Sequence, residues 1–176
     1  MKRIALVTVG ALALVFAGSK TASADTDSGT LTVTGTIQSS IGLTIESAGG
    51  TVTGAGTDAV TSDLGTIAKY DVSPPTGFTL TPGASDWTLS SSVGVKVEKA
   101  NITSDDYTLT AQLGSAPASG VTWKLNGSTL SNSSATTLTS TGTYGSTGSY
   151  SWDIVIADSA AAGSINNSVN FVATAN

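Results

Sequence analysis

The feature that most restricts the fold of this chain is an alternation of apolar and polar residues from Thr30 to Glu46. Its apolar members all occupy odd positions, with Gly35 and Ser39 in the two gaps: Leu31, Val33, Ile37, Ile41, Leu43 and Ile45. A period of two predicts an extended chain with one apolar face. At roughly 3.3 Å per residue the stretch would span about 56 Å, whereas strands usually have five or six residues. We therefore expect two successive strands, meeting near residues 38–40.

The first of these two strands, residues 30–37, has two possible partners. It can form the first edge strand of its own domain, with Gly35 at a bulge. Alternatively, it can leave its domain and add to the sheet of another molecule, where main-chain hydrogen bonds supply affinity and alternate side chains fill pockets. In that case Leu31, Val33, Gly35 and Ile37 are the subunit contacts, and Gly35 fits a pocket with no room for a Cβ. The sequence alone leaves both open.

The first 24 residues have the pattern of a secretory signal peptide. Lys2 and Arg3 precede an apolar run, 4–18, which is shorter than the about 20 residues of a membrane span. The small residues at 22–24 predict cleavage between Ala24 and Asp25. We expect a protein exported through the periplasm to the outside of a bacterial cell, with no transmembrane anchor in its mature part, 25–176.

Composition excludes several classes of function. All twelve acidic residues lie in the mature part, against only four lysines, so nucleic acid is disfavoured as a partner. The mature part has no His, Cys, Arg or Met. Catalytic triads and zinc sites built on His or Cys are therefore excluded, and disulfides are impossible. The one adjacent acidic pair, Asp105-Asp106, lies in a polar turn, so we predict no enzymatic activity and no cofactor.

The rest of the chain repeats the period of two. Alternation is clear in residues 87–97, 107–113, 121–125 and 150–156, and weaker strands are expected at 64–67, 78–80, 136–141 and 165–173. Turn-forming residues separate these runs, and no helical period follows the signal peptide. The sequence therefore predicts an all-β protein: a single antiparallel, immunoglobulin-like β-sandwich of about eight or nine strands.

Both ends of the mature chain resemble pilins of the chaperone–usher route. The L-x-V-x-G-x-I of Leu31–Ile37 resembles their donor segment, and Ala162 to Phe171 resembles their closing strand. The absence of cysteine is closer to the α-fimbrial (class 5) pilins. The resemblance implies a subunit whose residues 25–37 enter the next subunit, giving a fibre. It also implies a periplasmic chaperone and an outer-membrane usher as partners.

A second, weaker resemblance is to the WxL domains of bacterial cell walls. It is carried by Trp87-Thr88-Leu89 and Trp123-Lys124-Leu125. This resemblance implies a monomeric, secreted or wall-associated β-sandwich that binds a glycan or another surface component. Tyr144, beside a Gly/Ser-rich loop, is the candidate sugar contact, whereas Tyr150 and Trp152 share the parity of Ile154 and are expected in the core. A calcium site among Asp58, Asp63 and Asp71 remains a further alternative.

Overall fold

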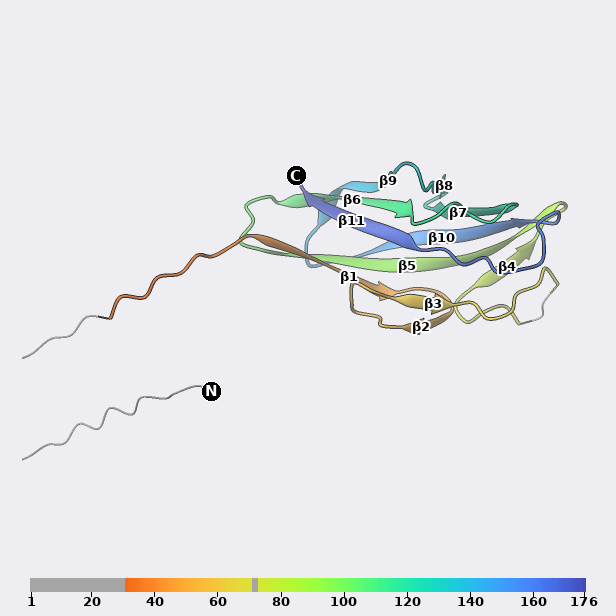
Figure 1. Ribbon diagram of the computed structural model, residues 1–176, viewed down its shortest axis with the longest axis horizontal. Coiled ribbons are helices and arrows are strands. Elements are labelled where there is room, and N and C mark those ends of the chain that lie inside the picture. The colour runs from red at the N-terminus through yellow and green to blue at the C-terminus, as the bar shows by residue number, and fades with distance from the viewer. Residues whose placement is uncertain (1–30, 71–72) are drawn as a thin grey trace, which may run out of the picture. The chain divides into compact units, whose positions relative to one another are not determined.

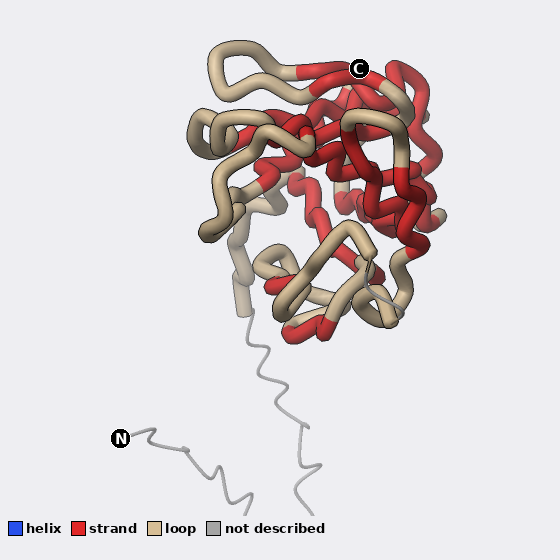
Figure 2. The backbone as a smooth tube through the Cα atoms, turned by 90° about the vertical axis from the view of Figure 1, so that its right-hand side faces the viewer, coloured by secondary structure: helices blue, strands red, loops and turns tan. Residues whose placement is uncertain are grey.

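The computed structural model describes residues 31–70 and 73–176, which form strands, turns and loops without a helix (Figures 1 and 2). The expected signal peptide and its cleavage site at Ala24 and Asp25 lie outside the described residues. In the described part of the chain, no helix is long and apolar enough to cross a membrane. Residues 36–176 form one compact unit.

Eleven strands make up this part of the chain. In order they are β1 (Ser40–Ser47), β2 (Thr51–Thr53), β3 (Thr61–Asp63), β4 (Thr79–Pro82), β5 (Asp86–Ala100), β6 (Asp106–Leu113), β7 (Val121–Leu125), β8 (Ser128–Thr129), β9 (Thr136–Thr143), β10 (Thr147–Ala157) and β11 (Val169–Ala175). All pairings between them are antiparallel. The prediction of an all-β, antiparallel protein is confirmed.

The larger sheet is built around β5, a strand of 15 residues. Its order is β1-β5-β10-β7-β8, and β4 also pairs with β5. Residues 87–90 of β5 pair with β4 and residues 94–100 pair with β1, whereas residues 86–96 pair with β10. Because β4 and β1 pair with successive halves of β5, they follow one another along the same edge of this sheet (Figure 1).

The second sheet has three strands in the order β11-β6-β9, and β2 and β3 form a separate two-stranded hairpin. Residues 128–131 join the two sheets on one side. The amide of Leu130 donates to the carbonyl of Trp123 in β7 at 2.8 Å, and the amide of Leu113 in β6 donates to Ser131 at 3.0 Å. No such connection joins β1 to β11 on the other side in the described residues.

The core lies between the inward faces of β5, β7 and β10 on one side and β6 on the other. Its fully buried side chains follow the predicted alternation and include Leu89, Val95, Val97, Leu109, Ala111 and Ile154. Tyr150 and Trp152 are buried here, as their parity predicts. Trp152 stacks on Trp123 with ring centroids 6.1 Å apart and meets Phe78 edge-on at 5.2 Å. These contacts make a sandwich-like fold whose two sheets share one core.

Three details differ from the sequence-based expectation. The strand expected at 64–67 is absent, and β3 forms just before it; β2, β3 and β8 raise the strand number above eight or nine. The last strand begins at Val169 rather than at Ile165. Asn167 explains this late start, because its Oδ1 accepts from the amides of Ser168 at 2.9 Å and Ser115 at 3.3 Å. Such local side-chain bonds compete with the ladder of a sheet.

A glycine opposite a buried tyrosine gives a direct test of this packing. Gly142 pairs with Tyr107 across β9 and β6, and a Cβ at Gly142 would lie 2.3 Å from the Tyr107 ring. We expect Gly142→Ala to lower the free energy of unfolding by about 1–3 kcal/mol, the usual cost of overpacking. Gly42→Ala is the matched control, because a Cβ there meets nothing within 4 Å. Urea denaturation of both variants measures the difference; equal stabilities would contradict this packing.

Candidate functional site: a groove between β1 and β11

The free edge of β11 presents a row of unpaired backbone groups. The amide of Gly114 donates to the carbonyl of Ser168, and the amide of Asn176 donates to the carbonyl of Asp106. Even-numbered residues of this segment therefore face β6, since hydrogen-bonded and non-hydrogen-bonded pairs alternate in an antiparallel ladder. The N–H and C=O groups of the odd-numbered residues, Val169, Phe171, Ala173 and Ala175, point to the free edge. An exposed edge of this kind is a template for another strand.

The outer edge of β1 is open at its beginning and occupied near its end. At Ile45 the amide donates to the carbonyl of Thr57, and the carbonyl accepts from the amide of Gly56, both at 2.8 Å. The same alternation directs the backbone groups of Ile41 and Leu43 outward. The side chains of Ile41, Leu43 and Ile45 pack against the core but are only partly buried. On this side the larger sheet ends at β1 and the three-stranded sheet ends at β11. The apolar faces of these two neighbouring strands are only half covered.

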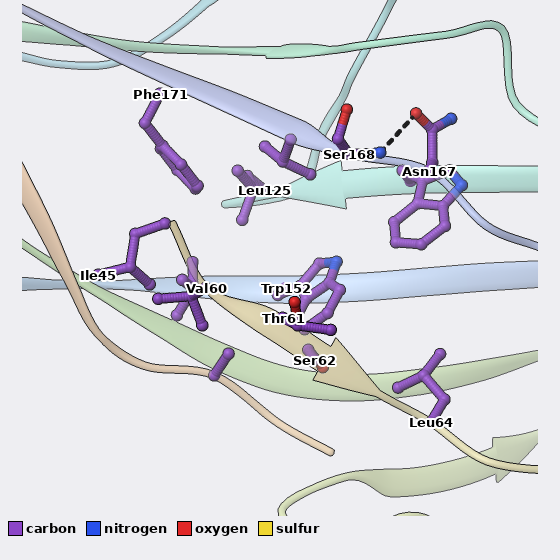
Figure 3. A pocket seen from close by; sticks show the side chains of 14 residues that line it. Ile45, Val60, Thr61, Ser62, Leu64, Leu125, Trp152, Asn167, Ser168 and Phe171 are labelled. Carbon is purple, nitrogen blue, oxygen red and sulfur yellow. Dashed lines mark hydrogen bonds between the residues drawn. The ribbon is translucent and has the colours of Figure 1, made fainter. Parts of the chain in front are cut away.

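A groove of about 350 Å³ opens where β1 ends and β11 begins; Ile45 is the residue of β1 that lines it, and Val169 and Phe171 are those of β11. Figure 3 shows Ile45 and Phe171 at one end and Leu64 and Asn167 at the other, with Trp152 between them. The floor comes from the larger sheet and is apolar: Val93, Trp123, Leu125 and Trp152. One wall comes from β11 and the other from residues 60–64. The groove is therefore suited to alternate apolar side chains of an extended peptide.

Two polar groups in this region lack a partner. The indole Nε1 atoms of Trp123 and Trp152 are buried, and neither makes a hydrogen bond among the described residues. An unpaired buried donor costs about 1–3 kcal/mol. Both tryptophans line the groove, so these two unpaired donors lie at its floor.

The four predicted subunit contacts do not form a strand of their own sheet. Residues 31–39 carry no strand, and the side chains of Leu31, Val33 and Ile37 are 87%, 82% and 81% exposed. A Cβ at Gly35 would meet nothing within 4 Å. In the structure residues 31–39 belong to no sheet, and the choice between an edge strand of the same domain and a strand given to another molecule stays a prediction. Among residues 31–70 and 73–176, this alternating apolar segment pairs with no strand.

Tyr144, the candidate sugar contact, is half-buried and does not line the groove. Its ring lies 5.1 Å from that of Tyr107, and the ammonium of Lys99 lies 4.9 Å from its centre. Its hydroxyl is buried and makes no hydrogen bond among the described residues. These contacts leave less of the ring for stacking on a sugar than an exposed loop residue would offer. Binding of a glycan at Tyr144 stays a prediction.

Charged groups lie away from the groove's floor. Lys69 forms an ion pair with Asp158 at 2.7 Å, beside a wider cavity of about 910 Å³. The hydrogen bond that Lys69 donates to Asp158 raises the pKa of Lys69, and the one that Lys96 donates to Glu98 raises the pKa of Lys96. Within residues 31–70 and 73–176, no three carboxylates gather as a metal site, and Asp71 lies outside them. The residues that line the groove carry no charged side chain.

No family model matches this chain, and no curated protein or solved structure is similar enough to identify a relative. The resemblances to pilins and to WxL domains thus remain expectations that rest on the quoted residues.

Proposed function

We propose that this chain is an exported structural subunit that polymerises by strand addition into a fibre outside the cell. In this proposal residues 31–37 of one subunit enter the groove between β1 and β11 of the next. The sandwich of each subunit then gains the strand that an immunoglobulin-like fold requires on its open side. The role is mechanical rather than catalytic, and a periplasmic chaperone and an outer-membrane usher are the proposed assembly partners.

The observation that carries the proposal is that one chain has both a free strand edge, on β11, and an exposed apolar segment, residues 31–37, that belongs to no sheet. Three aliphatic side chains, Leu31, Val33 and Ile37, are exposed over four-fifths of their surface. The same chain has an apolar groove flanked by an unpaired strand edge. Burying the three side chains would contribute about 1.5–3 kcal/mol each, and each backbone hydrogen bond about 0.5–1.5 kcal/mol. A segment and a groove of this kind are complementary.

The geometry of such a contact favours an open assembly. Each subunit would give a strand at its N-terminal segment and receive one at a different place, the groove. A contact between two different surfaces is heterologous, and it generates a filament unless the rotation closes a ring. Length is then limited by subunit supply rather than by symmetry.

Deletion of Asp25–Ile37 tests this function. We expect the mature protein, 25–176, to form filaments visible by electron microscopy and large species in sedimentation velocity. The protein lacking Asp25–Ile37 should sediment as a monomer, because it has a groove but no strand to give. Dispersed single particles of the full mature protein at every concentration would contradict the proposed function.

A further inference from the structure

Residues 60–64 have the same pattern as the exposed segment 33–37. Val33-Thr34-Gly35-Thr36-Ile37 is aliphatic, polar, small, polar, aliphatic, and Val60-Thr61-Ser62-Asp63-Leu64 has the same order. Alternate residues of an extended chain face the same side, so both segments present two aliphatic side chains separated by a small residue.

In the structure, residues 60–64 lie at the groove and use this apolar side to line it. Val60, Ser62 and Leu64 are half-buried, whereas Thr61 and Asp63 are exposed. Figure 3 shows β3 crossing the view between β11 and β5, with Val60 and Leu64 at its two ends. The segment therefore covers apolar surface that a bare groove would expose to water.

The attachment of this segment is weak. Strand β3 pairs only with β2, over three residue pairs, and the hairpin touches β1 through the Ile45–Thr57 bridge. The hydroxyl of Ser62 adds a hydrogen bond to the carbonyl of Gly49. An isolated two-stranded hairpin is marginally stable in water. Leu64 packs against the core, but the backbone pairing of this segment is confined to the hairpin, and regions with little such pairing open at lower free-energy cost than a core.

We propose that residues 60–64 cover the groove of a free subunit and occupy the place that the strand of a second copy takes on assembly. On assembly, Val33, Gly35 and Ile37 of a second copy take the places of Val60, Ser62 and Leu64. This inference rests on the proposed function and names the occupant and its register. In the free subunit the groove is then covered before assembly. Release of β3 becomes a step that controls the rate of assembly.

A labelled peptide tests this exchange. The probe is fluorescein-labelled TLTVTGTIQ, residues 30–38, added to the full mature protein carrying Val33→Asp so that its own segment cannot compete. Adding Val60→Thr and Leu64→Thr should raise the association rate, measured by fluorescence anisotropy, by about tenfold, the factor that 1.4 kcal/mol of lost cover contact gives. The control probe is the same peptide with aspartate in place of its valine, which should bind neither protein.

The outcomes distinguish a failure of this inference from a failure of the proposed function. Equal association rates in the two proteins would contradict the claim that residues 60–64 cover the groove, and they would leave the proposal of strand addition intact. Absence of peptide binding to both proteins would overturn the proposed function and this inference together. Hydrogen exchange of the unaltered mature protein with excess peptide gives a second test that needs no variant in 60–64. Amides of 61–63 should lose protection while those of Phe171 and Ala173 gain it; increased protection at 61–63 would contradict the exchange.

Discussion

Val33→Asp should abolish assembly of the mature protein while leaving the folded subunit intact. In the free subunit Val33 is 82% exposed, so the free energy of unfolding should change by no more than about 0.5 kcal/mol. In the groove an aspartate would bring an unpaired charge against Trp152 and Leu125 and would forfeit the burial of the valine. Subunit association should weaken by about a thousandfold or more, since each 1.4 kcal/mol is tenfold.

Thr34→Asp is the matched control for this substitution. It adds the same charge one residue further along, on the opposite side of an extended segment, where a donated strand would face solvent. Sedimentation velocity across a concentration series compares the two variants with the parent. Parent-like assembly of Val33→Asp, or an equal loss in both variants, would show that the apolar face of this segment does not enter a groove.

Ala173→Pro should block the receiving side of the contact with little cost to the monomer. The amide of Ala173 points to the free edge of β11, so proline removes a donor that the free subunit does not use. Proline is tolerated on edge strands in this orientation. A strand arriving at β11 would lose a ladder hydrogen bond and meet the ring, so the assembled fraction should fall sharply at concentrations where the parent is polymeric.

Thr174→Pro makes the opposite change at the next residue. Thr174 pairs with Thr108, and its amide faces β6, so proline there removes a hydrogen bond that the monomer needs. We expect Thr174→Pro to be less stable than Ala173→Pro by about 1–3 kcal/mol in urea denaturation. If Ala173→Pro is the less stable of the two, or assembles as the parent does, β11 does not receive a strand at this edge.

Long alternating runs in the sequence predicted the centre of the fold correctly. Strands β5, β6, β7 and β10 lie where the period of two placed them, because their apolar residues face one continuous core. Of the two strands expected in the opening stretch, the structure contains only the second: β1 begins at Ser40, and residues 31–39 carry no strand. These elements are fixed by burial, which the pattern of side chains records directly.

The groove could not be predicted from the sequence, because it depends on which strands lie at the edges of the two sheets. The pairing of β1 and β4 with successive halves of β5 comes from long-range contacts that no local pattern encodes. Strand β3 was missed for a related reason. Residues 61–63 are polar, and their half-buried neighbours Val60 and Leu64 make sense only once the groove is present. The exposed segment 31–37, in contrast, was recognisable from its own spacing.

The measurement that tests the account most directly is a cryo-electron-microscopy map of the assembled mature protein. We predict continuous density in which residues 31–37 of one subunit lie between β1 and β11 of its neighbour, with Val33 and Ile37 facing Trp152 and Leu125. Density for residues 31–37 in the groove of their own subunit, or filaments whose grooves between β1 and β11 are empty, would contradict it.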